Sequence, residues 1–411
     1  MKILAISHLF PNVGNKHFGI FAARQFATMK QLGADVTVLV PTVWVPGFLW
    51  WLRPTWKNLE QNRMLVRYDE LETIAVPYLR LTRGFWSCRW EGLCVFYSSK
   101  NKVLELHRKI PFDVIFGRGF FPGADVGVRL AKTLKIPVVG FGIGSDVNVV
   151  PHYSRSMYRH FVRVAKLLDG ALGHGRGVAD KIAAVTGRQT PTVHGIVDLN
   201  AFAPPQNKTA VKKELNISSD NFVMLYIGGL TQTKGVYEML DAFCRVKDKY
   251  PQVMLKICGT GQEEEKLREK IRTQNPRFNV ELLGAVEPDK VAKWMQASDV
   301  LILPSYSEGM PNVVMEAMAC GLPVISTKVG GLPDAVGDCD GVILVEPKNV
   351  GQLASAMEKL VKDENVRRYM GIEARKRAVE KFGNIENVQK ILDYIIQIVE
   401  KHKKVNISIE K

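Results

Sequence analysis

Residues 300–334 read VLILPSYSEGMPNVVMEAMACGLPVISTKVGGLPD. The apolar run at residues 300–303 predicts a buried strand, and the polar loop after it leads into a helix that begins near Pro311. Proline suits the first turn of a helix, where its missing N–H would have no acceptor. A second apolar strand is predicted at residues 324–326. A strand, a helix and a strand in this order are typical of a parallel sheet covered by helices.

The same alternation runs through both halves of the 411-residue chain. In the first half, apolar runs predict strands at residues 2–7, 35–40, 113–116, 137–141 and 192–194. In the second half, they predict strands at residues 222–227, 253–257, 280–283, 300–303, 324–326 and 342–345. A polar stretch with two prolines at residues 202–207 predicts a linker, and residues 349–401 are predicted to be helical.

We therefore expect an α/β fold with two Rossmann-like, doubly wound domains that face each other across a cleft. The first domain is expected at residues 1–205 and the second at residues 206–380. Residues 381–411 are expected to form a C-terminal helix and tail that pack back on the first domain.

The composition indicates a globular protein of the cytoplasm. With 46% apolar and 24% charged residues, the chain can bury two sizeable cores. The longest apolar stretches stop near ten residues, whereas a membrane-spanning helix needs about 20. The apolar run at the start ends at Ser7 and is followed by no cleavage site, so it is interpreted as a strand and not as a signal peptide.

The cysteines and histidines predict no metal site. None of the six cysteines forms a CxxC pair, which favours a reducing compartment, and the eight histidines are scattered without zinc-ligand spacing. Asp338 and Asp340 have the outline of an Asp-x-Asp metal motif, but the glycines at residues 337 and 341 favour a polar turn. We therefore expect no metal and no other cofactor.

Positive charge is concentrated in the first half of the chain. Residues 1–205 contain 26 Lys and Arg against 13 Asp and Glu, whereas residues 206–411 contain 30 against 28. Such an uneven field favours an anionic partner: nucleic acid, an acidic membrane surface or a phosphorylated acceptor. No compact nucleic-acid motif is present, so nucleic acid is not expected as a partner.

Two carboxylates flank the start of the helix predicted near Pro311. The helix-start amides and the helix dipole suit an anion such as a diphosphate. Glu316 lies about one turn inside the helix and is suited to accept two hydrogen bonds from a ribose diol, whereas Glu308 lies in the preceding loop and is suited to face a transferred sugar. The alternative is that Glu308 is a solvated loop acid and Glu316 an exposed helix residue.

This segment resembles the signature of glycosyltransferase family 4. The resemblance rests on Glu308 and Glu316 as a Glu-x7-Glu motif, on AMACGLPV at residues 317–324 and on GGLPD at residues 330–334. It extends over the whole chain through the segments 17–21 with Gln25, 197–199, 228–235 and 259–261. The first of these is similar to family members that build bacterial surface polysaccharides.

The resemblance implies a GT-B fold and retaining transfer of a hexose from a nucleotide sugar, expected to be UDP-linked, to a lipid-linked or glycan acceptor. It implies that Lys234 neutralises the leaving diphosphate, Glu316 holds the ribose and Glu308 contacts the hexose. The donor would also be bound by Gly19, Gly309, Met310, Pro311, Asn312 and Val313. Arg118 and Asp146 would lie on the acceptor or sugar side.

The chain departs from the family pattern at Gly229, where an arginine is usual, and at Ile143, where a histidine or arginine is expected. These departures favour a second hypothesis, a non-catalytic relative that binds a nucleotide sugar. A sugar-nucleotide epimerase on the same fold is the third hypothesis.

An aromatic and basic stretch at residues 44–57 is a possible acceptor or membrane region. Its rings are interleaved with cations, a composition that suits an anionic membrane surface. The residues predicted to face the membrane are Trp50, Trp51, Arg53, Trp56 and Lys57. In the alternative, the rings line the acceptor cleft or bind sugar faces.

Overall fold

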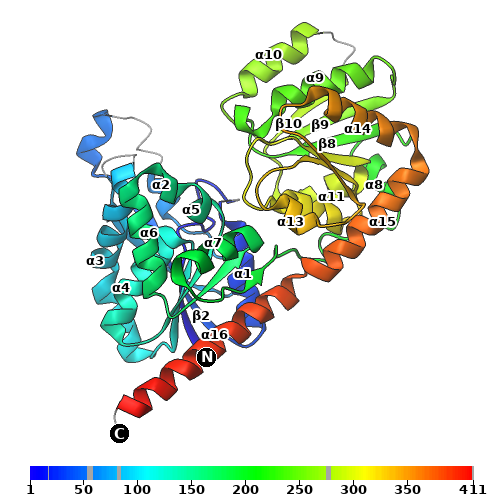
Figure 1. Cartoon of the computed structure of the whole chain (residues 1–411). Helices are drawn as coiled ribbons and strands as arrows, with labels where there is room; N and C mark the ends of the chain where they lie inside the picture. The colour runs from blue at the N-terminus through cyan, green and yellow to red at the C-terminus, as the bar shows by residue number, and fades with distance from the viewer. Residues whose placement is uncertain (17, 53–58, 81–84, 275–278, 410–411) are drawn as a thin grey trace. The chain divides into compact units, whose positions relative to one another are not determined.

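The computed structural model describes residues 1–16, 18–52, 59–80, 85–274 and 279–409, and it divides the chain into two compact units (Figure 1). The first unit comprises Met1–His194 and Asn384–Lys411, and the second comprises Gly195–Gly383. The first boundary therefore differs from the predicted one between residues 205 and 206. The reason is that the segment after Gly195 bonds within the second unit: the Val197 N–H donates to the Phe382 carbonyl at 2.8 Å.

A seven-stranded parallel sheet forms the centre of the first unit, in the order β3-β2-β1-β4-β5-β6-β7. The strands are β1 (Lys2–Ile6), β2 (Asp35–Trp44), β3 (Glu72–Leu79), β4 (Val114–Arg118), β5 (Val138–Gly142), β6 (Gly170–His174) and β7 (Thr192–Val193). Neither β3 nor β6 was predicted. Strand β3 contains Pro77, which an edge strand tolerates, and β6 contains two glycines, which weaken the pattern of a strand.

Helices cover this sheet in two groups (Figure 1). The helices are α1 (Ile20–Gln31), α2 (Leu59–Arg63), α3 (Phe85–Lys109), α4 (Asp125–Leu134), α5 (Ser145–Asn148), α6 (Arg155–Leu167), α7 (Arg176–Thr186) and α16 (Asn384–Ile409). Helices α3, α4 and α6 contact one another, and α1 contacts α16. Short turns lie at η1 (Gly47–Leu52), η3 (Phe120–Ala124) and η4 (Val150–Tyr153).

Helix α16 belongs to the first unit although it ends the chain. It buries an apolar stripe at helical spacing, made of Val388, Ile391, Leu392, Ile395 and Val399. The Asn384 side chain donates a hydrogen bond to Thr28 of α1 at 2.6 Å, and the Tyr394 hydroxyl accepts one from the Ala171 N–H in β6 at 3.3 Å.

A six-stranded parallel sheet forms the second unit, in the order β10-β9-β8-β11-β12-β13. Its strands are β8 (Phe222–Ile227), β9 (Val253–Cys258), β10 (Val280–Gly284), β11 (Val300–Leu303), β12 (Val324–Thr327) and β13 (Val342–Val345). Its helices are α8 (Lys208–Glu214), α9 (Val236–Lys247), α10 (Glu264–Gln274), α11 (Pro288–Ala297), α12 (Asn312–Ala319), α13 (Leu332–Val336), α14 (Val350–Lys362) and α15 (Glu364–Lys381), with the turn η5 (Gln232–Lys234). All six strands were predicted, and two doubly wound α/β sheets are confirmed.

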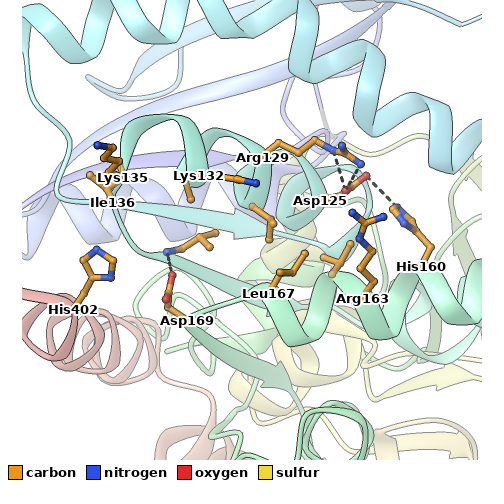
Figure 2. A pocket seen from close by; sticks show the side chains of 14 residues that line it. Asp125, Arg129, Lys132, Lys135, Ile136, His160, Arg163, Leu167, Asp169 and His402 are labelled. Atoms are coloured by element: carbon orange, nitrogen blue, oxygen red, sulfur yellow. Dashed lines mark hydrogen bonds and ion pairs between the residues drawn. The ribbon is translucent and has the colours of Figure 1, made fainter. Parts of the chain in front are cut away.

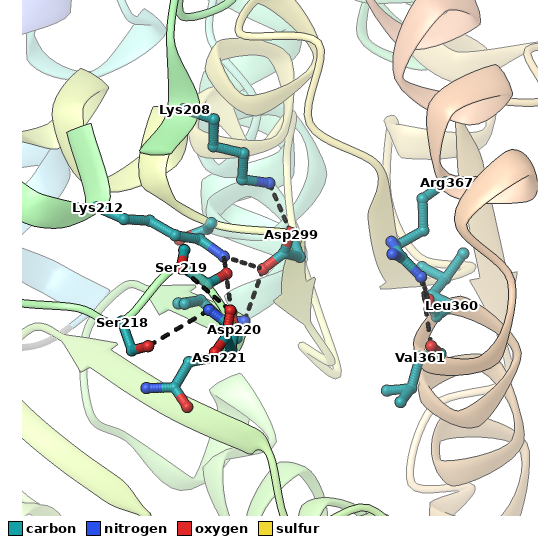
Figure 3. A network of polar contacts seen from close by, with 12 residues as sticks. Lys208, Lys212, Ser218, Ser219, Asp220, Asn221, Asp299, Leu360, Val361 and Arg367 are labelled. Atoms are coloured by element: carbon teal, nitrogen blue, oxygen red, sulfur yellow. Dashed lines mark hydrogen bonds and ion pairs between the residues drawn. The ribbon is translucent and has the colours of Figure 1, made fainter. Parts of the chain in front are cut away.

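A polar network at the amino ends of β8 and β11 joins α8 to this sheet (Figure 3). Asp299, directly before β11, accepts hydrogen bonds from Lys208 at 2.6 Å, from Lys212 at 3.3 Å and from the Val223 N–H at 2.8 Å. Lys212 also donates to the Asn221 carbonyl at 2.7 Å. Each of these charges therefore has an opposite charge or a carbonyl to compensate its burial.

None of the helices in the described part of the chain is long and apolar enough to cross a membrane. Cys94, Cys244, Cys258, Cys320 and Cys339 are free thiols.

Candidate functional site

Two charged side chains meet at the carboxyl ends of β8 and β11. Lys234 ends the turn η5 after β8, and Glu308 lies in the loop between β11 and α12. The Lys234 Nζ atom lies 2.7 Å from Glu308 Oε1, and the two side chains are 30% and 10% exposed. Strand order reverses between β8 and β11, and ligands of doubly wound sheets bind at such a switch point.

Two glycines allow the backbone to hold these loops. Gly330 has a φ of 61°, and a Cβ atom there would lie 1.8 Å from the Glu308 carbonyl oxygen. Gly235 has a φ of 67°, and its Cβ would lie 2.1 Å from the Pro304 oxygen. A direct bond from the Tyr306 N–H to the Thr233 carbonyl, at 2.8 Å, links the lysine loop to the glutamate loop.

The start of α12 lies directly after the Glu308 loop. Pro311 precedes the helix in an extended conformation, and no side chain caps the helix there. Among the described residues, the Asn312 and Val313 N–H groups have no hydrogen-bond acceptor, because the first such bond is from Val314 to the Pro311 carbonyl. Free amides at a helix start, next to Lys234, make this place suited to an anion.

Glu316 is buried, with 6% of its surface exposed. The pKa of the nearby Cys320 thiol is raised to about 12, mainly by burial and to a smaller extent by the charge of Glu316. The alternatives in which Glu316 is an exposed helix residue and Glu308 a solvated loop acid are therefore wrong. The contact of Glu316 with a ribose stays a prediction, as do the contacts of residues 309–313 with a donor.

Tyr226 is a residue that sequence reasoning missed. It is buried in β8, and its hydroxyl donates a hydrogen bond to the Gly229 carbonyl at 2.9 Å. Burial and the charge of Glu308 both raise the pKa of Tyr226, so the phenol stays protonated. A Cβ atom added to Gly229 would have no heavy atom within 4 Å. The space that the usual arginine side chain would enter is therefore open in this chain.

The first unit has its own polar cluster at the carboxyl ends of its strands. It contains the predicted residues Arg118 and Asp146, and also His8, His174 and Gln25, which were not predicted. The Arg118 Nε donates to Gln25 Oε1 at 2.8 Å. His8 follows the strand predicted at residues 2–7, which is a signal that could have found it. His174 ends β6, whose residues do not predict a strand.

Backbone amides hold Asp146 in this cluster. Its carboxylate accepts hydrogen bonds from the N–H groups of Phe120 at 2.7 Å, Gly144 at 2.8 Å and Ile143 at 3.0 Å. Burial raises the pKa of Asp146, and these hydrogen bonds oppose the rise. Burial lowers the pKa of Arg118 to about 10, and the Asp146 carboxylate partly offsets that fall.

The two histidines of the cluster are neutral at pH 7. Burial, followed by the charge of Arg118, lowers the pKa of both His8 and His174 to about 4. Buried polar atoms without a partner in the described residues include His8 Nδ1 and Gln25 Nε2. Such atoms can bond to a ligand without giving up a protein contact.

Gly19 is required by the packing of the chain itself. It has a φ of 71°, and a Cβ atom there would lie 2.2 Å from the Leu9 carbonyl carbon. Its predicted approach to a diphosphate stays a prediction.

The aromatic stretch exposes side chains on η1. Phe48 is 76% exposed and Trp51 is 77% exposed. The placement of the Trp50 side chain is not described, and Arg53, Trp56 and Lys57 lie outside the described residues.

The described residues contain no group of three or more His, Cys, Asp or Glu side chains that could hold a metal ion. Within the Asp-x-Asp outline, the Asp340 carboxylate accepts a hydrogen bond from the Tyr369 hydroxyl at 2.8 Å.

Comparison with known proteins finds relatives of this chain among glycosyltransferases. Residues 207–377 match the family model described as glycosyl transferases group 1. The chain is 27% identical over 362 residues to a Bacillus subtilis glycosyltransferase, TuaC, which is named for teichuronic acid biosynthesis; the match covers 87% of this chain and 89% of TuaC. It is 31% identical over 327 residues to a D-inositol 3-phosphate glycosyltransferase of Streptomyces bingchenggensis, covering 71% of this chain and 68% of that protein.

Solved structures share the fold of the whole chain. The sucrose-phosphate synthase of Thermosynechococcus elongatus has a TM-score of 0.75 at 20% identity, covering 98% of this chain and 100% of that one. HepE of Anabaena, solved in complex with UDP, has a TM-score of 0.72 at 19% identity, covering 97% of this chain and 100% of HepE. The two parallel sheets, the signature around Glu308 and the extended match to the Streptomyces enzyme together show that this chain belongs to the group 1 glycosyltransferases, with the GT-B fold.

Proposed function

We propose that this chain transfers a hexose from a UDP-linked sugar, with retention of configuration, to a lipid-linked or polysaccharide acceptor of a cell-surface glycan. The observation that carries the proposal is the pairing of Lys234 with Glu308 beside the uncapped start of α12. The name of TuaC supports a surface-glycan product, and the HepE complex with UDP supports a uridine nucleotide.

Each part of the donor has a matching group in this site. The diphosphate would bind the amides of Asn312 and Val313 and the Lys234 ammonium. Without a donor, Lys234 is neutralised by Glu308. When a diphosphate takes over Lys234, the Glu308 carboxylate becomes free to face the sugar.

The proposed reaction exchanges one bond to the anomeric carbon for another. The bond to the diphosphate oxygen breaks, and the acceptor oxygen forms a bond on the same face of the sugar. The acceptor proton passes to the leaving diphosphate. Lys234 and the helix amides would stabilise the negative charge that develops on the diphosphate, and Glu308 the positive charge on the sugar. These groups supply the neutralising charge, so the proposal includes no metal ion.

The first unit is proposed to bind the acceptor and an anionic membrane surface. The exposed rings of Phe48 and Trp51 support membrane contact, since aromatic side chains favour the interface between lipid and water. The excess of basic residues in the first half of the chain supports attraction to anionic lipid headgroups. If the proposal holds, the protein acts at the inner face of the plasma membrane.

The proposal is tested by incubating the purified protein with radiolabelled UDP-sugars and a membrane extract that supplies acceptor. We expect transfer from one donor, and a loss of about 100-fold or more in Lys234→Ala and Glu308→Gln. Lys290→Ala and Glu269→Gln change the same charges at exposed positions of the second unit and are expected to keep full activity. Proton NMR of the product reports the anomeric configuration.

The other outcomes distinguish the remaining hypotheses. Binding of UDP without transfer or donor hydrolysis would establish a non-catalytic relative. Conversion of a UDP-sugar in the absence of acceptor would establish an epimerase. Inversion of the anomeric configuration would exclude retention.

A further inference from the structure

A cavity of about 810 Å³ lies in the first unit between α4, α6 and the end of α16 (Figure 2). Its lining includes Val138, the first residue of β5, and Asp169, which precedes β6. These are the amino ends of the strands, whereas Arg118 and Asp146 lie at or beyond the carboxyl ends of β4 and β5. The cavity is therefore separate from the polar cluster described above, and it is large enough for a small organic ligand.

Basic side chains from three helices and a helix end line this cavity. They are Arg129 and Lys132 on α4, Lys135 directly after α4, Arg163 on α6 and His402 on α16. Figure 2 shows Arg129 and Lys132 on the α4 side of the space and Arg163 on the α6 side.

The two carboxylates of the lining are already satisfied. Asp125 lies 3.2 Å from both Arg129 and His160, and Asp169 accepts a hydrogen bond from the Val138 N–H at 2.8 Å. Within the described residues, Lys132 and Arg163 have no acidic partner. The lining therefore has four Lys and Arg side chains against two carboxylates, and the exposed Lys132 and Arg163 side chains are accessible to a ligand.

A role in stabilising helix ends does not account for all of these cations. Lys132 lies in the last turn of α4, where a cation stabilises the helix dipole. In α6, however, the cation of the last turn is Lys166, which does not line the cavity. Arg163 lies earlier in that helix and faces the same space as Lys132.

The rest of the lining is apolar. It includes Val128, Ala131, Ile136, Val164 and Leu167. A ligand whose anionic group binds the cations can therefore also place a less polar body against this wall.

We propose that this cavity binds the phosphate group of a phosphorylated organic molecule, as a phosphomonoester or a diphosphate. Separate cations on facing helices suit the several oxygens and multiple charge of a phosphate group, and arginine binds such oxygens in pairs. The organic body of the ligand occupies the apolar wall. The phosphate belongs either to a free metabolite or to a lipid headgroup, and the experiment separates these two sources.

The test is calorimetric titration of the full chain with sodium pyrophosphate at low ionic strength, in the presence of saturating UDP to occupy the site at Lys234. We expect one binding site, weakened at least about tenfold in Lys132→Ala/Arg163→Ala, since each charge-assisted contact contributes more than about 1 kcal/mol. The control Lys166→Ala/Lys181→Ala removes the same charge from exposed positions outside the lining and is expected to bind as the unmodified protein does. Titration with UDP itself shows whether either variant has lost its fold or its donor site.

A second arm measures sedimentation with phosphatidylcholine vesicles that contain phosphatidic acid or phosphatidylserine at equal charge. Preference for phosphatidic acid that is lost in Lys132→Ala/Arg163→Ala assigns the phosphate to a lipid, whereas pyrophosphate binding without this preference assigns it to a free metabolite. Equal affinities in the two double variants, or no binding in either arm, would overturn the proposal. Because UDP titration reports the donor site by itself, failure here is distinguishable from failure of the proposed function.

Discussion

At the scale of single residues, the position of Glu308 depends on a glycine far from it in the sequence. Gly330 follows β12, and its backbone packs directly on the Glu308 carbonyl. The next residue continues the contact, because the Gly331 N–H donates to the Gly309 carbonyl at 2.7 Å. The glycines of the signature thus shape the loop that carries its first glutamate.

Gly330→Ala is expected to lower the free energy of unfolding by at least about 2 kcal/mol and to weaken UDP binding. The added Cβ would lie 1.8 Å from the Glu308 oxygen, so the loop has to move. Gly284→Ala is the matched control, since Gly284 also has a positive φ, of 71°, but no atom within 4 Å of a Cβ. Urea unfolding and UDP titration measure both effects; equal losses in the two variants would contradict the role given to the contact.

The buried histidines predict a dependence of stability on pH. With a pKa of about 4 in the folded state and 6.5 ordinarily, His8 and His174 bind fewer protons when folded than when unfolded between these values. The free energy of unfolding is therefore expected to fall as the pH decreases from 6.5 to 4, by about 1–3 kcal/mol for each histidine.

Urea unfolding across this pH range tests the expectation. His8→Gln and His174→Gln should each flatten the decrease, whereas His152→Gln, at an exposed position, should leave it unchanged. Parallel curves for all variants would show that neither buried histidine causes the pH dependence.

At the scale of elements, hydrogen bonds and ion pairs from Asp299 connect α8 to the sheet of the second unit (Figure 3). The Lys212 side chain is only 7% exposed, and the Asp299 side chain is 13% exposed. Burial lowers the pKa of Lys208, and Asp299 opposes this change. The carboxylate thus compensates two lysines at once.

Asp299→Ala is expected to lower the free energy of unfolding by about 3–5 kcal/mol, because it leaves a buried Lys212 without its opposite charge and removes an acceptor from the Val223 N–H. Asp220→Ala, at an exposed position of the loop between α8 and β8, should cost less than about 1 kcal/mol. Urea unfolding measures both, and a loss in Asp299→Ala as small as that in Asp220→Ala would mean that the network does not stabilise the unit.

At the scale of the whole molecule, the uneven charge of the chain and the exposed rings of η1 act together in the proposed membrane contact. Phe48→Ser/Trp51→Ser is expected to weaken binding to anionic vesicles about tenfold or more, because burying two rings contributes on the order of 2–4 kcal/mol. Trp90→Ser/Tyr97→Ser is the control, since these side chains are 63% and 70% exposed on a different helix. Vesicle sedimentation at rising salt measures the effect, and equal losses in the two variants would argue against docking through η1.

Strands β8, β9, β11 and β12 could be predicted because each is a mostly apolar run buried on both faces, as expected for a parallel sheet. Strand β6 could not be predicted from its residues, GALGH. Its first glycine leaves room for α16: a Cβ on Gly170 would lie 2.8 Å from Ile398 and 3.0 Å from Tyr394. The presence of Gly170, which weakens the strand pattern of β6, is therefore explained by its packing against α16. That helix lies more than half the chain length away in the sequence.

The sequence by itself determined the α/β class of both units, the six strands of the second unit, the loop that carries Glu308, the helix that starts after Pro311 and the family. Local periodicity and capping residues report burial and turns, and these need only neighbouring residues. The tertiary structure alone decided that Lys234 lies 2.7 Å from Glu308 and that His8 and His174 join Arg118. Those facts depend on strand order and on the packing of distant segments, which no local pattern specifies.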